Sequence, residues 1–156
     1  MSLTRPPRGR VSFSLLSGTA ILLNMLLVKT KLGQSPIDGI GLFADEFIPK
    51  GTRVWEYRDG VDSRFDETFL ESLPVPVQSQ LRKYAYKNMR TGWYVLCGDD
   101  ARFFNHSDTP NTVDLEEGEG IVNGEGITIA ARDIQIGEEI VSDYHTFDAN
   151  TSKKGI

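Results

Sequence analysis

The residues between Arg102 and Asn111 carry the polar side chains that are best suited to chemistry. Two aromatic residues, Phe103 and Phe104, run directly into the polar pair Asn105–His106. The Ser-Asp-Thr-Pro-Asn residues that follow favour a turn, because Asp, Asn and Pro form local hydrogen bonds or fix φ. We therefore expect a buried segment, Arg102–Phe104, that delivers an amide and an imidazole to one site. Composition alone also allows an ordinary core strand that ends in a polar loop.

The same residues disfavour two other chemistries. Ser107 directly follows His106, and consecutive residues do not readily face each other as nucleophile and base, so a serine hydrolase is not expected. His106, His145, Asp108 and Asp143 carry donor atoms, but their spacing fits no standard ligand pattern, so the sequence predicts no metal. Cys97 is the single cysteine and excludes both an internal disulfide framework and a multi-cysteine zinc site.

Two further segments favour a functional interpretation of the Asn-His run. Asp38–Ala44 reads DGIGLFA, and Gly137–Tyr144 reads GEEIVSDY. With the Asn-His run between them, over residues 26–147, they resemble the SET-domain family of protein-lysine methyltransferases. The resemblance implies transfer of a methyl group from S-adenosylmethionine to the side-chain amine of a lysine in a protein or peptide. It also implies a mainly β, β-clip-like fold of several short curved sheets, with a small helical insert and a threaded C-terminal pseudoknot.

Roles for individual residues follow from this resemblance. It implies that Tyr144 is the catalytic tyrosine, at the end of a strand, where its phenol can hydrogen-bond at the reacting centre without carrying full charge. Asn105 and His106 would hold the cofactor by hydrogen bonds. Tyr94 would stand where cofactor and target lysine meet, so that Tyr94 and Tyr144 line the substrate channel. Phe147 is the candidate lid aromatic that stacks on adenine, or else a residue of a disordered tail.

The glycine motif has a structural and a functional interpretation. Asp38-Gly39 is a hairpin signal, because glycine accepts the positive φ that such turns need, and a hairpin alone would explain Gly39 and Gly41. Residues without a Cβ also let a ligand touch the backbone. The resemblance implies that Gly39, Ile40 and Gly41 meet the methionine part of S-adenosylmethionine.

The sequence departs from many relatives at one point. Asp108 stands where they carry cysteine, so we expect that the zinc site of the cysteine-rich module that often follows the domain is absent as well. The presence of Tyr144, Asn105, His106 and both glycines favours an enzyme. A catalytically silent peptide-binding module on the same fold is the alternative.

Composition limits the partners. The chain has 156 residues, a net charge of −5 and a pI of about 5.0. This length fits one domain with a short tail. Because no lysine or arginine run exists beyond the N-terminal arginines, nucleic acid is not an expected partner. An acidic surface favours a basic protein substrate. The oligomeric state and the number of methyl groups transferred are not determined by the sequence.

The N-terminal residues leave one question open. Residues 1–24 are expected to be an extension, disordered or apolar, before a catalytic domain at 25–147 and a tail at 148–156. Residues 11–28 contain no charge, so a membrane anchor or signal is an alternative to a loosely packed extension. Polar residues dilute this stretch and its length is marginal for a span. We expect a cytoplasmic protein, with membrane anchoring or a nuclear location as alternatives.

Turn signals every eight to twelve residues predict a mainly β fold. The insert, at about residues 62–90, is expected to contain two helices, 67–73 with Asp66 as N-cap and 78–87. Residues 111–119 are expected to form a solvated hairpin arm or loop. Strands are expected at 26–32, 42–47, 52–57, 92–97, 127–131 and 139–144.

Overall fold

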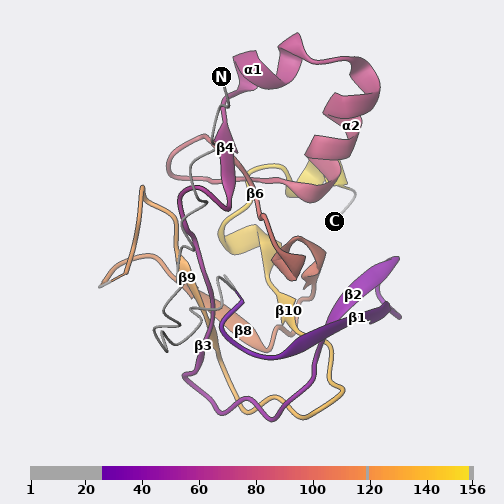
Figure 1. The fold of residues 1–156 in the computed structure, drawn as a ribbon, viewed down its shortest axis with the longest axis vertical. Coiled ribbons are helices and arrows are strands. Elements are labelled where there is room, and N and C mark those ends of the chain that lie inside the picture. Colours follow the sequence, from indigo (N-terminus) through magenta and orange to yellow (C-terminus); the bar gives the residue numbers. More distant parts are fainter. Residues whose placement is uncertain (1–25, 119, 155–156) are drawn as a thin grey trace, which may run out of the picture.

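Four small sheets enclose two hydrophobic clusters, a larger one at the centre and a smaller one in the insert, in the computed structural model, which describes residues 26–118 and 120–154. The expected N-terminal extension, residues 1–24, lies outside the described residues. In Figure 1, the β3–β9–β8 sheet and the β1–β2 hairpin flank the central strand β10, and the two helices lie at one end of the molecule. The predicted mainly β architecture with a small helical insert is confirmed. Within the described residues, no helix has the length and apolar composition needed to cross a bilayer.

The first hairpin joins β1 (Thr30–Gln34) to β2 (Ile40–Ala44) in antiparallel register. Its turn contains Gly39 at φ +47°, a backbone conformation that glycine adopts at low cost. The first strand was expected at 26–32, but Leu26 instead forms an isolated bridge with Trp55. The hairpin therefore begins later than the apolar run, because the burial of Leu26 comes from the core and not from strand pairing.

The central sheet has the order β3–β9–β8 and is antiparallel throughout. Its strands are β3 (Arg53–Glu56), β8 (Thr112–Leu115) and β9 (Ile127–Ala130). The segment 111–119 was expected to be solvated, but Asn111 and Thr112 are buried. Asn111 is buried because its side chain bonds the backbone of Glu139 and Val141, at 2.7 and 2.9 Å.

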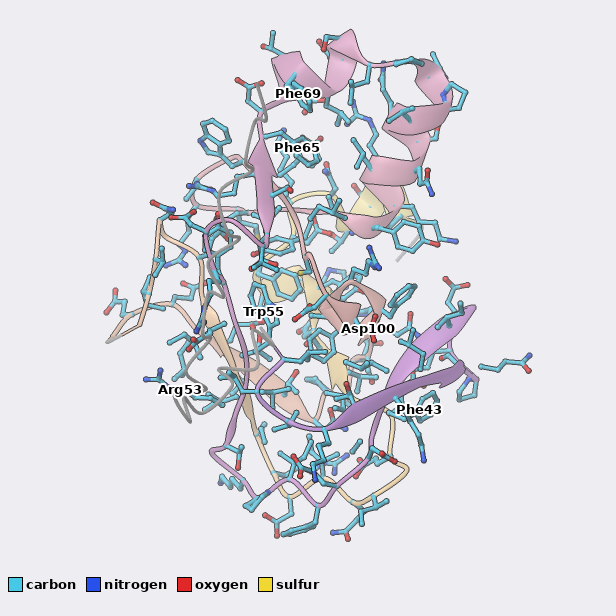
Figure 2. The ribbon with its side chains drawn as sticks, in the orientation of Figure 1. Phe43, Arg53, Trp55, Phe65, Phe69 and Asp100 are labelled. Carbon is cyan, nitrogen blue, oxygen red and sulfur yellow. The ribbon has the colours of Figure 1, made fainter. Side chains whose placement is uncertain are left out.

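The insert combines β4 (Ser63–Phe65), β5 (Tyr86–Lys87) and β6 (Tyr94–Leu96) with two helices. Helix α1 (Glu67–Ser72) begins after Asp66, whose carboxylate accepts from the Phe69 amide at 2.8 Å, as predicted for its N-cap. Phe65 on β4 and Phe69 on α1 lie at the helical end of the molecule, whereas Trp55 lies nearer its centre (Figure 2).

Helix α2 (Val75–Tyr84) starts and ends three residues earlier than the predicted helix 78–87. Pro76 fits in its first turn, where a missing N–H costs nothing. Ala85 is extended, and Tyr86 and Lys87 pair with β6. Long-range pairing therefore overrides the helical spacing at the end of this segment.

The remaining short elements are close to the Asn-His run. They are the strands β7 (Asn105–His106) and β10 (Val141–Ser142) and the 3-10 turns η1 (Asp100–Phe103), η2 (Tyr144–Thr146) and η3 (Thr151–Lys154). The prediction that Arg102–Phe104 is buried is wrong, because Arg102 is exposed and Phe103 and Phe104 are half-buried. The core lies on the other side of η1, where Ala101 is buried.

Candidate active site

A parallel pair of two-residue strands brings two of the sequence motifs together. Strand β10 pairs with β7 so that Val141 faces Asn105 and Ser142 faces His106. The amide of Ser107 then donates to the carbonyl of Ser142 at 3.1 Å. Because β10 ends two residues before Tyr144, this register sets the tyrosine next to the Asn-His pair.

Tyr144 is fixed at both its backbone and its hydroxyl. Its amide donates to Nδ1 of His106 at 3.2 Å, and the two rings lie 5.6 Å apart. Its hydroxyl donates to the backbone carbonyl of Phe104. Asp143 caps the turn by accepting from the His145 amide at 2.9 Å. The phenol is therefore held against the strand that carries Asn105 and His106.

Burial raises the pKa of Tyr144 above its usual value, and the nearby Asp148 carboxylate raises it further. A phenol in this environment stays neutral and acts as a hydrogen-bond donor. It is poorly suited to accept a proton as a general base, because the phenolate would be costly to form.

Asn105 connects the glycine motif to the other two. Its Nδ2 donates to the carbonyls of Asp38 and Ile40 at 3.1 and 3.3 Å, and to Oε1 of Glu139 at 2.8 Å. Among the described residues, its Oδ1 accepts no hydrogen bond. The amide thus holds the hairpin turn in place and keeps one acceptor available.

The two glycines play different parts. A Cβ on Gly39 would meet no atom within 4 Å, so its backbone is open to a ligand. A Cβ on Gly41 would instead collide with the carboxylate of Glu139, which the hydroxyl of Ser35 also binds at 3.0 Å. The absence of a side chain at Gly41 therefore makes room for Glu139, whereas only Gly39 fits the expected close approach of a ligand. The side chain of Ile40, between them, is 51% exposed.

Tyr144 also lines a cavity of about 80 Å³. Aromatic rings dominate its wall near the tyrosine: Phe147 lies 5.6 Å from the Tyr144 ring, and Tyr86 lies 5.3 Å from Phe147, both edge to face. Phe104 and Trp55 complete this wall. Tyr144 therefore contacts the His106 ring and also lines this cavity.

Tyr86 was not expected at the site. Its hydroxyl donates to Oε2 of Glu125 at 2.8 Å, and Glu125 is fully buried and pairs with Arg64 at 3.4 Å. The sequence pattern placed Tyr86 in a helix, on the strength of apolar residues at helical spacing. Only its pairing with β6 turns the ring toward Phe147, so no local signal identifies it.

Tyr94 is not among the residues that line this cavity. Its ring is fully buried and stacks on Phe65 at 5.5 Å. Its hydroxyl donates to Glu67 at 2.8 Å and accepts from Arg82 at 2.8 Å. These contacts all lie in the insert, so the described geometry gives no support to the roles expected for Tyr94 at the cofactor and in the channel. Phe147 lines the cavity with Tyr144, and its stacking on adenine stays a prediction.

A group of metal-type donors also forms near the tyrosine. Donor atoms of His106, Asp108 and His145 lie within 4.8 Å of one another. However, Nδ1 of His106 accepts the Tyr144 amide, so the neutral ring carries its proton on Nε2, which lies 3.3 Å from Asp108. Metal-bound histidines normally donate their second N–H. While it makes this hydrogen bond, Nδ1 of His106 is not free to bind a metal, and the absence of a metal stays a prediction.

Comparison with known families identifies the fold. A SET-domain profile matches residues 39–145, which include the glycine turn, the Asn-His pair and Tyr144. The chain therefore belongs to the SET-domain family, as its three motifs predicted. No curated protein sequence matches the chain.

Solved structures support the same fold. A Plasmodium falciparum protein provisionally assigned as a histone methyltransferase has a TM-score of 0.54 and 24% identity, over 75% of this chain and 93% of that one. A humanized mutant of Chaetomium thermophilum Polycomb Repressive Complex 2, bound to the inhibitor GSK126, has a TM-score of 0.55 and 23% identity. The match covers 81% of this chain but 16% of that larger chain.

Proposed function

We propose that this protein transfers a methyl group from S-adenosylmethionine to the side-chain amine of a lysine in a protein substrate. The observation that carries the proposal is the position of Tyr144. Its hydroxyl is held by the Phe104 carbonyl, between the Asn105–His106 strand and an aromatic cavity. A methyl donor on one side of this phenol and a lysine on the other would meet at a single point.

The residues around Asn105 fit the proposed cofactor. The free Oδ1 of Asn105 can accept from an ammonium group, and the open backbone at Gly39 allows close approach. Bound there, S-adenosylmethionine would supply an electrophilic methyl group on a sulfonium. His106 would act mainly through its backbone, because its ring is already engaged by Tyr144 and Asp108.

The cavity provides what the acceptor amine needs. A lysine amine has a pKa of about 10.4 in water and must lose its proton before it can attack. Aromatic walls disfavour the charged form and hold the side chain in line, and alignment accounts for much of any rate gain. Tyr144 orients the neutral amine, and water carries the proton away.

The substrate class follows from the same cavity and from charge. A narrow site lined by Tyr86, Phe147 and Tyr144 suits the four-carbon stem of lysine. The net charge of −5 favours a basic protein. Histone-like tails and basic cytoplasmic proteins both meet this description.

Two measurements test the proposal against the silent peptide-binding alternative. Calorimetry of the full chain with S-adenosylmethionine should show saturable binding, and its absence would favour the silent module. Incubation of a cell lysate with the chain and isotopically labelled S-adenosylmethionine, followed by mass spectrometry, should identify labelled lysines. Cofactor binding without any labelled lysine would contradict the assignment of lysine as acceptor.

A further inference from the structure

One lysine of the chain already lies in the cavity proposed for the substrate. The ammonium of Lys154 lies 5.2 Å from the centre of the Tyr144 ring. It also lies 2.8 Å from Oδ2 of Asp148 and donates to the Ala85 carbonyl at 3.1 Å. Only 15% of the Lys154 side chain is exposed. A carboxylate, a carbonyl and an aromatic face together form a good site for an alkylammonium.

The other described cations of the cavity wall are engaged elsewhere. Lys83 lies over the Tyr84 ring at 5.5 Å, and Arg102 lies over Phe103 at 5.3 Å. Arg90 donates to two backbone carbonyls, those of Glu116 and Gly124, at 2.9 and 2.8 Å. Of the cations in this wall that the structure describes, Lys154 is the one placed against the proposed catalytic tyrosine.

The segment that carries Lys154 is anchored at its start. Asp148 is buried, and one of its oxygens accepts from the amides of Lys87 and Asn150 at 3.0 and 2.9 Å. Its other oxygen pairs with Lys154. The amide of Lys154 donates to the carbonyl of Asn150 at 3.2 Å, so a short turn returns the chain to the cavity. The expected polar tail is therefore packed over the site in its described part.

We propose that Lys154 is an internal competitor that occupies the lysine-binding cavity until a substrate lysine displaces it. This inference rests on the proposed function, because it assumes that the cavity receives a substrate lysine. Both ammonium groups would need the same aromatic wall, so they cannot occupy the cavity together. When Lys154 fills the cavity, only a fraction of the chains has an open cavity. The apparent dissociation constant for the substrate is then the intrinsic constant divided by this fraction.

Steady-state kinetics of the full-length Lys154→Ala variant test this proposal, with purified core histones as the basic protein probe. We expect the KM for histones to fall about three-fold or more, because every chain then presents an open cavity. The kcat and the KM for S-adenosylmethionine should stay as in the wild type. Lys154→Arg should keep the wild-type KM for histones, because it retains a cation at the same site. Lys50→Ala, in an exposed turn, is the matched control for the loss of one positive charge.

The outcomes separate this inference from the proposed function. If the wild type methylates histones and Lys154→Ala has the same KM for them, Lys154 is no competitor and only this inference fails. A lower kcat with unchanged KM would also overturn it, because it would make Lys154 a residue that positions Tyr144. If Lys154→Ala has a lowered melting temperature, Lys154→Met is measured in its place, because methionine keeps most of the aliphatic stem. If no preparation methylates any protein, the proposed function itself fails.

Discussion

Two tyrosines, Tyr94 and Tyr144, occupy opposite situations in this molecule. The Tyr94 hydroxyl lies between Glu67 and Arg82, within the insert, and its hydrogen bonds are satisfied by fixed side chains. The Tyr144 hydroxyl has one backbone partner, the Phe104 carbonyl, and faces a cavity. A phenol held by an ion-pair network maintains the fold, whereas a phenol with one partner beside open space is available to a ligand.

The carboxylates of the two regions show the same contrast. Hydrogen bonds from Arg82 and Lys87 lower the pKa of Glu67 to about 2. Burial raises the pKa of Asp114, in the cavity wall, to about 6. Hydrogen-bonded cations therefore stabilise the charge of Glu67 in the insert, whereas burial disfavours the charge of Asp114 in the cavity wall.

Replacing Tyr144 with Phe should produce the largest effect. We expect methylation to fall by about 10²- to 10⁴-fold, the range typical for loss of a group that acts at the reacting centre. The affinity for S-adenosylmethionine should change little, since the hydroxyl bonds Phe104 and not the Asn105 region. Single-turnover kinetics and calorimetry measure the two quantities. Tyr94→Phe is the matched control. If Tyr94→Phe loses activity and Tyr144→Phe does not, the contrast drawn between the two tyrosines is wrong.

Asn105→Ala should weaken S-adenosylmethionine binding by about ten-fold or more, because it removes the free acceptor and leaves nearby backbone groups less well paired. Calorimetry measures the dissociation constant. Ser35→Ala is the control, since it removes the hydrogen bond from Ser35 to Glu139 without touching the Asn105 amide. Equal losses in both variants would assign the effect to Glu139 and its turn and not to cofactor contact.

Tyr94→Phe should destabilise the protein by about 1–2 kcal/mol, because Glu67 and Arg82 each lose a hydrogen bond in a partly buried network. Urea unfolding followed by tryptophan fluorescence measures this. Tyr84→Phe serves as control, since the Tyr84 hydroxyl makes no hydrogen bond within the described residues. If the two variants unfold alike, the insert network does not stabilise the fold as its geometry suggests.

Asp114 should give an effect that is visible only as a pH dependence of stability. Burial raises the pKa of Asp114 from its ordinary value of 3.8 to about 6, so the folded state binds more protons than the unfolded state between these values. Its contribution to stability is therefore fully present below about pH 4 and is lost as pH rises through 6. A shift of about two pKa units corresponds to at most about 3 kcal/mol, so Asp114→Asn should remove up to that much of the loss of stability between pH 4 and pH 8. If Asp114→Asn keeps the wild-type dependence of stability on pH, another group is responsible for that dependence.

The sequence predicted those parts of the molecule that depend on local chemistry. The N-cap at Asp66, the turn at Gly39 and the family follow from residue types at fixed spacing. It also predicted the Asn105–His106 pair and Tyr144, which the structure brings together through β7 and β10. Each of these motifs carries its own local signal, and the roles of its residues in cofactor binding and catalysis stay predictions.

Features that depend on long-range contacts were missed. Pairing with β4 directs the ring of Tyr94 to Phe65, a contact that its position before the Asn-His motif does not indicate, and its role at the site stays a prediction. Tyr86 gains its place at the cavity from pairing with β6. The packing of Asp148 beneath Lys154 depends on contacts with residues more than 60 positions away. The spacing of residues within one segment does not indicate such contacts.

The two-residue pairing of β7 with β10 also constrains how the protein matures. Asn105 is synthesised well before Val141, and the pair cannot form until the later strand has left the ribosome. During that interval the rest of the sheets can already pair, while the reaction centre is incomplete. A nascent chain should therefore pair most of its sheets before β10 joins β7 and brings Tyr144 to the Asn105–His106 strand.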